Sequence, residues 1–117
     1  MNKEQFLDNI KKDQKKGFDL ILSKNTDYSS EDETFKNFDI VELICGVSSE
    51  CGILVRMCDK ITRIGNLLDK EPLVKDESIE DTLLDLANYS YILLARIKAR
   101  KNNLKITNKH ENNTPLS

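Results

Sequence analysis

A long run of small and apolar residues, spaced alternately four and three positions apart, constrains the fold of this chain more than any other feature. A repeat of this kind places all of its members along one side of an α-helix. Its members are Ile40, Ile44, Val47, Cys51, Leu54, Cys58, Ile61, Gly65 and Leu68. Because such a side must pack against another helix, we expect a long central helix over residues 39–69, with a closely approaching partner.

The rest of the chain has the pattern of further helices. Asn2 and Gln5 are placed like a cap before the first apolar repeat, and Pro72 ends the central helix. The expected helices cover residues 3–23, 39–69 and 77–101. The connection after the central helix is short, so the last two helices should be antiparallel. We predict an all-α fold, a bundle of long antiparallel helices in a single domain over residues 1–101, followed by a polar, disordered tail over residues 102–117.

Composition restricts the partners of this fold. The chain has 117 residues and a net charge of −2, with 38% hydrophobic and 32% charged residues. This balance fits half-solvated helices that complete their core by self-association, so we expect a homodimer or a larger homo-oligomer. Without a global basic field we expect no nucleic-acid partner. No apolar run has the length of a membrane span and the N-terminus lacks a signal-peptide core, so we expect a cytoplasmic protein.

The cysteines and the histidine indicate no catalytic site of their own. Cys45, Cys51 and Cys58 all lie in the expected central helix, where they cannot pair sensibly with one another. We interpret them as small, reduced core residues. His110 is the only histidine and lies in the polar tail, so we do not expect catalysis by histidine or cysteine.

An acidic stripe marks the start of the helix expected over residues 77–101. Glu77, Asp81, Asp85 and Asn88 fall within one narrow sector of that helix. Carboxylates four residues apart repel by roughly 0.2–0.5 kcal/mol per pair, so the stripe costs stability unless a cation lies among them. A solvated face with acids in the first turn explains the beginning of the stripe equally well. Asp85 and Asn88 lie beyond the first turn, which favours a binding site.

The central helix carries polar residues that fit a phosphate or base site. Arg56, Asp59, Arg63 and Asn66 cluster on the flank opposite the apolar side, and they combine cations with hydrogen-bonding groups. An ion pair of Asp59 with Arg63, worth a few tenths of a kcal/mol, is an alternative explanation for part of this cluster. Glu50 lies at the edge of the apolar side, where an acid is uncommon without a partner.

Several blocks of the sequence together resemble the all-α nucleotide pyrophosphohydrolases, the MazG-like and dimeric dUTPase-like group. The resemblance is closest to the phage and bacterial branch called nucleotide modification associated domain 1, and it covers about residues 20–95. For a phage-encoded member of this branch, the expected location is the host cytoplasm. The blocks are Lys24-Asn-Thr-Asp-Tyr28, Glu31-Asp32 with Phe35-Lys-Asn-Phe38, Arg56-Met-Cys-Asp-Lys60 with Arg63 and Asn66-Leu-Leu68, and Glu77-Ser-Ile-Glu-Asp-Thr-Leu-Leu-Asp-Leu-Ala-Asn-Tyr89.

This resemblance implies a MazG-like bundle that binds a nucleoside triphosphate, possibly a modified one, with Mg²⁺ or alternatively Mn²⁺. The implied reaction is hydrolysis between the α- and β-phosphates. In the group, an EExxE motif on one helix and an ExxD motif on the next hold the metal. Here Glu50 matches the first motif, while Ser49 and Ile53 stand where its other two acids would be. Asp81 matches the last position of the second motif, whose glutamate is replaced by Ser78.

We therefore predict a nucleotide and metal site between the central helix and the acidic helix. Its expected metal ligands are Glu50, Glu77, Asp81 and Asp85, and Glu50 is also expected to position the attacking water. The residues expected to bind the substrate are Lys24, Asp27, Tyr28, Asn37, Arg56, Asp59, Lys60, Arg63, Asn66 and Asn88. Because the acid motifs are incomplete, two alternatives stay open: a protein that binds or sequesters a nucleotide without turnover, and a helical interaction module without a ligand.

Overall fold

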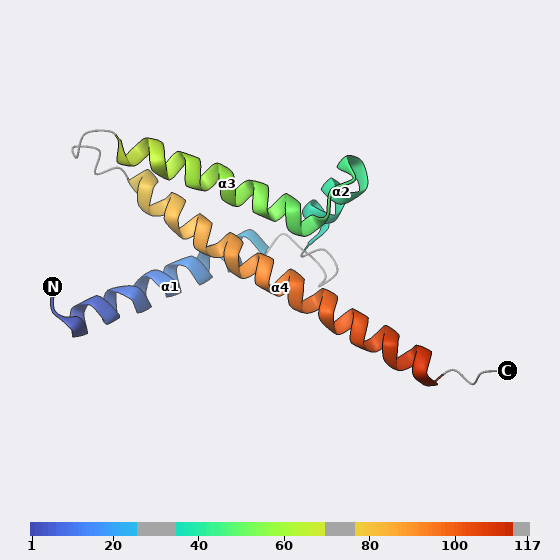
Figure 1. Cartoon of the computed structure of the whole chain (residues 1–117). Coiled ribbons are helices and arrows are strands. Elements are labelled where there is room, and N and C mark those ends of the chain that lie inside the picture. Colours follow the sequence, from blue (N-terminus) through green and yellow to red (C-terminus); the bar gives the residue numbers. More distant parts are fainter. Residues whose placement is uncertain (26–34, 70–76, 114–117) are drawn as a thin grey trace.

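The computed structural model describes residues 1–25, 35–69 and 77–113, with the side chains of residues 1–24, 35–69 and 78–104. Within these residues the chain is helical and contains no strand, which confirms the predicted all-α class. The helices, in chain order, are α1 (Lys3–Asn25), α2 (Lys36–Cys45), α3 (Ser49–Leu68) and α4 (Glu77–Asn113) (Figure 1).

α1 begins at the predicted cap. The backbone N–H of Gln5 donates to Asn2 Oδ1 at 2.8 Å, and the backbone N–H of Asn2 donates to Gln5 Oε1 at 3.0 Å. Each side chain thus satisfies a backbone group that the first turn of a helix leaves unpaired. The helix continues to Asn25, two residues beyond the predicted end.

The prediction of one helix over residues 39–69 is wrong, because the chain turns between α2 and α3. Gly46 has a φ of 70°, a left-handed conformation that glycine adopts without steric cost, and its N–H donates to the carbonyl oxygen of Glu42 at 3.0 Å. Ser48 is extended, and its Oγ accepts a hydrogen bond from the N–H of Cys51 at 3.1 Å. A glycine C-cap and a serine N-cap therefore separate the two helices.

The last helix is longer than predicted. α4 continues to Asn113, although residues 102–117 have the composition of a disordered tail. No glycine or proline occurs between residues 78 and 113, so nothing in the backbone chemistry interrupts the helix before that point. None of the described helices combines the length and the apolar character that a membrane crossing requires.

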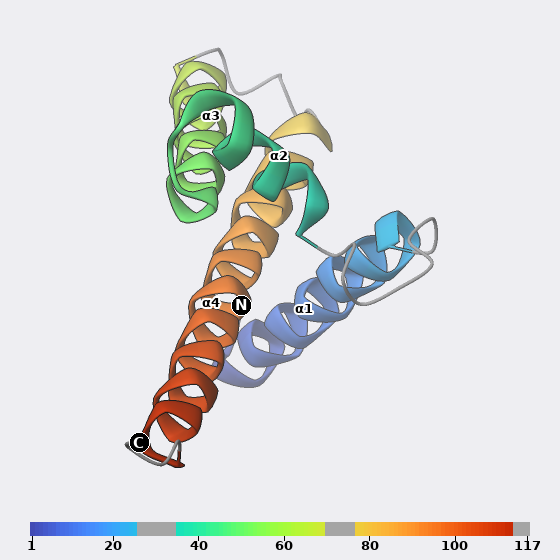
Figure 2. The same cartoon turned by 90° about the vertical axis from the view of Figure 1, so that its right-hand side faces the viewer.

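α4 is the element against which the others are arranged. α3 packs beside α4 in the antiparallel orientation, and α1 packs against a different side of α4. In Figure 2, α4 therefore lies between α3 and α1. α2 packs on the first part of α3. Contacts among these helices therefore bring residues of α1, α3 and α4 together near the start of α4.

The helices enclose very little apolar core. Among the described residues, Ile53 is the only apolar side chain that is fully buried. The radius of gyration is 19.0 Å, whereas a compact domain of this length has about 13 Å. Most large apolar side chains of the described helices are exposed instead. A single copy of the chain is consequently an open arrangement of helices.

Candidate functional site

Three of the predicted site residues meet where α1, α3 and α4 come together. Lys60 Nζ of α3 lies 3.1 Å from Asp85 Oδ2, and Lys24 Nζ, near the end of α1, lies 3.7 Å from Asp85 Oδ1. The Asp85 side chain of α4 is 24% exposed. Two ammonium groups and one carboxylate leave one positive charge in excess, so this lysine cluster (Lys24, Lys60 and Asp85) is suited to an anion.

The fourth predicted residue of this region, Asn88, joins α4 to α1. Its Nδ2 donates a hydrogen bond to the carbonyl oxygen of Gly17 at 3.1 Å, and both residues are buried. A Cβ atom at position 17 would lie 3.2 Å from Asn88 Oδ1. Gly17 therefore permits the close approach of the two helices one turn of α4 away from Asp85.

An apolar groove of about 840 Å³ lies between α1 and α4 beside this contact. Its lining includes the aromatic rings of Phe18, Phe35 and Tyr91, and the amide of Asn88. Ligand sites commonly combine an apolar cavity with a few polar groups at its edge. None of the lysine-cluster residues lines the groove, but Leu84 and Asn88, which do, are one and three positions from Asp85 on α4.

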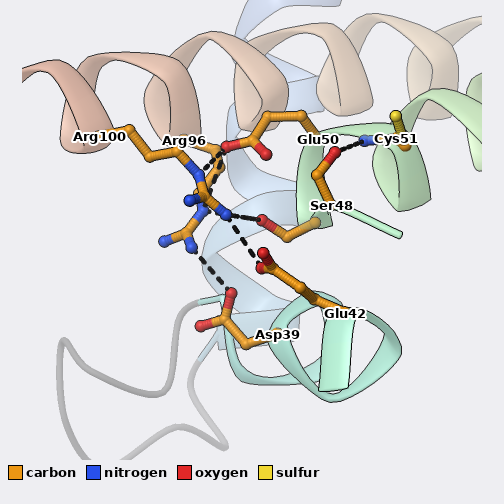
Figure 3. A network of polar contacts seen from close by, with 8 residues as sticks. Asp39, Glu42, Ser48, Glu50, Cys51, Arg96 and Arg100 are labelled. Atoms are coloured by element: carbon orange, nitrogen blue, oxygen red, sulfur yellow. Dashed lines mark hydrogen bonds and ion pairs between the residues drawn. The ribbon is translucent and has the colours of Figure 1, made fainter. Parts of the chain in front are cut away.

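The predicted catalytic residue, Glu50, belongs to a different cluster at the start of α3 (Figure 3). Arg100 donates a hydrogen bond from Nε to Glu50 Oε1, and Arg96 Nε lies 3.6 Å from the same oxygen. Arg100 also donates from Nη2 to Glu42 Oε2 at 2.9 Å, and Arg96 Nη2 lies 3.0 Å from Asp39 Oδ1. Carboxylates of α2 and α3 are thus tied to two guanidinium groups of α4.

This cluster is held together by charge. Partial burial raises the pKa of Glu50, but its backbone hydrogen bond and the Arg100 guanidinium lower it by more, so the net pKa lies below its ordinary value. Burial lowers the pKa of Arg100, and the carboxylates of Glu50 and Glu42 raise it above its ordinary value. Both groups are therefore charged at neutral pH, and Glu50 stabilises the contact between α3 and α4.

Of the carboxylates predicted to bind magnesium, Glu50 and Asp85 lie in separate clusters, and the side chain of Glu77 lies outside the described residues. Among the described side chains, no three from histidine, cysteine, aspartate and glutamate are grouped so that they could hold a metal ion. Glu50 contacts two arginines and Asp85 contacts two lysines. Lys60, the partner of Asp85, is ten residues after Glu50 on α3, which is about 15 Å along a helix. The described donor groups of one chain therefore do not fit a magnesium site.

The remaining predicted residues take other positions. Arg56, Asp59, Arg63 and Asn66 are exposed on α3, Asn37 is exposed on α2, and Asp81 is exposed on α4. Only the backbone of Glu77 is described, and Asp27 and Tyr28 lie outside the described residues. Arg56 and Arg63 precede and follow Lys60 by four and three positions, so all three lie on one stripe of α3.

Sequence reasoning missed Arg96 and Arg100 as partners of Glu50. The two arginines are four residues apart and therefore share one face of α4. The Arg96 guanidinium also lies over the Phe35 ring, 5.3 Å from its centre. A pair of arginines at this spacing, late in a helix whose beginning is acidic, is the signal that could have identified them.

Comparison of the chain with models of protein families, with curated proteins and with solved structures finds no match in any of the three.

Proposed function

We propose that this protein binds a nucleotide, with its phosphate groups at the lysine cluster. The observation that carries the proposal is the convergence of Lys24 and Lys60, from two different helices, on the single carboxylate of Asp85. A phosphate group carries more charge than one carboxylate and accepts hydrogen bonds from ammonium groups. Arg56 and Arg63, on the same stripe of α3 as Lys60, extend the basic surface for further phosphates.

The base of the nucleotide is expected in the groove between α1 and α4. The groove offers aromatic faces on which a base can stack, and Asn88 offers an amide at its edge. An apolar groove close to a cationic cluster suits a nucleotide, whose base has aromatic faces that can stack in the groove and whose phosphates are anionic.

Binding without turnover is better supported than hydrolysis. Glu50 and Asp85, two of the four predicted metal ligands, are both neutralised by cations of the same chain. Magnesium-dependent hydrolysis, which the resemblance to nucleotide pyrophosphohydrolases implies, stays a prediction. Its direct assay is the release of pyrophosphate from nucleoside triphosphates in the presence of Mg²⁺ or Mn²⁺.

The exposed apolar side chains favour a second candidate function, a helical module that acts by association. They include Leu54 and Ile61 of α3 and Leu94 of α4, of which 50%, 55% and 46% are exposed. The two candidates are compatible, because a MazG-like bundle completed by oligomerisation would use both the lysine cluster and these apolar side chains.

Calorimetric titration of two lysine variants tests the nucleotide proposal. Lys60 and Lys12 each lie 3.1 Å from an aspartate, but Lys12 pairs with Asp8 on the outside of α1. The probes are nucleoside mono-, di- and triphosphates and inorganic triphosphate, each with chelator and with magnesium. We expect Lys60→Gln to weaken binding of the triphosphates about tenfold, the effect of one partly exposed charged hydrogen bond, and Lys12→Gln to leave it unchanged. Equal affinity of the two variants would contradict the proposal.

The variant Asp85→Asn distinguishes an anion site from a metal site. If Asp85 only neutralises the two lysines, its removal frees them and nucleotide binding becomes tighter. If Asp85 holds a metal ion that carries the phosphates, the same change weakens binding and reduces its dependence on magnesium. No binding of any probe by the unaltered protein would leave association as the supported function.

A further inference from the structure

α3 has two apolar sides, and only one of them is covered within the chain. The covered side faces α4 and contains the fully buried Ile53, with Met57, Ile64 and Leu67 partly buried. The other side continues the run of small and apolar residues found in the sequence. All of its members are exposed, and they are Cys51, Leu54, Cys58, Ile61, Gly65 and Leu68. This free side extends for about 26 Å along the helix.

The two glycines of α3 show which side is open. A Cβ atom at Gly52 would lie 3.5 Å from Val41 Cγ1, because α2 packs there. A Cβ atom at Gly65 would meet no described atom within 4 Å. α2 thus covers the side of α3 that lies away from the free side.

α4 carries a matching free side. Its exposed members, again spaced four and three apart, are Leu83, Ala87, Ser90, Leu94 and Ile97. On each helix the free side lies about 100° around the axis, in the same rotational sense, from the side on which α3 and α4 contact each other. Because the helices are antiparallel, both free sides point to the same side of the pair. Together these eleven residues form one surface, the free face, which contains no charged residue; Lys101, the next position in the spacing on α4, follows directly after its end.

The exposed area of the chain is far larger than that of a stable monomer. The chain exposes 9613 Å², whereas a compact monomer of 13.4 kDa exposes about 6,500 Å². A stable complex of standard size buries about 800 Å² on each partner. The excess of about 3,100 Å² therefore supplies several times the area that a stable dimer needs.

We propose that the free face binds the free face of a second copy of this chain, with the two copies of α3 antiparallel across a two-fold axis. With the axis between Asp59 and Lys60, Cys51 lies opposite Leu68 of the second copy. In the same arrangement Leu54 lies opposite Gly65 of the second copy, and Cys58 lies opposite Ile61 of the second copy. Each such pair of facing residues forms one layer of the interface. Every layer pairs a small residue with a large one, which lets two helices approach closely and still fill the space between them.

This alignment uses the free side of α3 completely. A shift of one copy by seven residues keeps the pairing of small with large, but it leaves two residues of the free side without a partner at each end. A two-fold contact also places each residue near its own counterpart or its neighbours, so charges of one sign would repel across it. The absence of charge on the free face satisfies this requirement. None of the predicted nucleotide-site residues lies on the free face, and Ala87 is its one member that also lines the groove between α1 and α4.

Substitution of one residue of the free face tests whether it is the interface. Ile61 and Leu22 have similar exposures, 55% and 50%, but Leu22 lies on α1. Light scattering of the unaltered protein should give at least twice the mass of one chain, 13.4 kDa. We expect Ile61→Glu to halve the mass and Leu22→Glu to leave it unchanged. A monomeric unaltered protein, or an unchanged mass for Ile61→Glu, would overturn the proposal.

A swap within one layer tests the alignment of the two copies. Leu54→Ala leaves a void and Gly65→Leu adds volume to the same layer, so each change alone should weaken dimerisation at least tenfold. The double variant restores the total volume of the layer and should dimerise within about threefold of the unaltered protein, as measured by sedimentation. A double variant weaker than both single variants would show that Leu54 does not face Gly65 of the second copy.

The three cysteines provide a test that needs no substitution. Cys45, Cys51 and Cys58 are all exposed in the single chain, but only Cys51 and Cys58 belong to the free face. Maleimide labelling followed by peptide mass spectrometry should therefore modify Cys45 at least tenfold faster than the other two. Equal labelling rates for all three thiols in the folded protein would refute the proposed interface.

Discussion

Replacement of Gly17 by alanine sets two opposing effects of similar size against each other. Alanine is more favourable than glycine in a helix interior by about 1 kcal/mol, so Gly17→Ala should stabilise α1 if nothing opposes it. The new Cβ atom, however, would lie 3.2 Å from Oδ1 of the buried Asn88 side chain, closer than an ordinary van der Waals contact. Asn88 also donates its hydrogen bond to the carbonyl oxygen of Gly17 at 3.1 Å.

The cost of displacing the Asn88 amide is expected to outweigh the gain in helix propensity at position 17. Loss of the hydrogen bond costs about 1 kcal/mol, and an unpaired buried amide costs about 1–3 kcal/mol more. Gly17→Ala should therefore lower the free energy of unfolding by about 1–3 kcal/mol. In the background of Asn88→Ala the clash is absent, and the same change should raise the free energy of unfolding by about 1 kcal/mol.

Urea unfolding of the four proteins, followed by circular dichroism, measures this coupling. The double-mutant cycle should give a coupling of about 2–4 kcal/mol between the two positions. If Gly17→Ala stabilises both backgrounds by the same amount, then α1 does not pack on α4 through this contact, and the placement of Lys24 beside Asp85 loses its support.

The turn between α2 and α3 and the arginine cluster yield three further predictions. Ser48→Ala should lower the free energy of unfolding by about 1 kcal/mol, because the N–H of Cys51 loses its cap. Ser48→Asp should keep most of the stability, because an aspartate oxygen can accept the same hydrogen bond. Gly46→Ala should cost about 1–2 kcal/mol because of the left-handed backbone, and Gly46→Asn should cost less, both by urea unfolding. The pKa of Glu50 is lowered from 4.5 in the folded protein, so its contribution to stability is present above pH 4.5 and is lost as the pH falls through the lowered pKa. Thermal unfolding should show Glu50→Gln less stable than the unaltered protein at neutral pH, with a difference that disappears in acid; a difference independent of pH would contradict the ion pair with Arg100.

The helical class could be predicted from the sequence, but the ends of the helices could not all be. Apolar spacing fixes the period of a helix, and this spacing continues from Ile44 through Val47 to Cys51 across the turn. The repeat therefore concealed the turn, which local chemistry determines through Gly46 and Ser48. At the C-terminal end, the polar composition suggested disorder from residue 102. The helix nevertheless continues, because no glycine or proline interrupts α4 before residue 113.

The members of the candidate site were predictable one by one, but their grouping was not. Lys24, Lys60 and Asp85 were each expected in a site, yet periodicity within one helix contains no information about which helices meet. An acid at the edge of an apolar side was expected to need a partner, and Glu50 does have partners. They are the guanidinium groups of Arg96 and Arg100, which lie 46 and 50 positions later in the sequence.

The small core has a consequence for the abundance of the protein in a cell. Ile53 is the only apolar side chain that the described part of one chain fully encloses. Burial of one isoleucine contributes only about 1.5–3 kcal/mol. Ordering the backbone costs about 1–2 kcal/mol for each residue. If the proposed association of two copies completes the core, the folded fraction should rise, by mass action, with the total amount of chain. Chains synthesised at low level would stay open to proteases, whereas chains above a threshold would persist. The protein would thus accumulate in a switch-like manner as its synthesis increases.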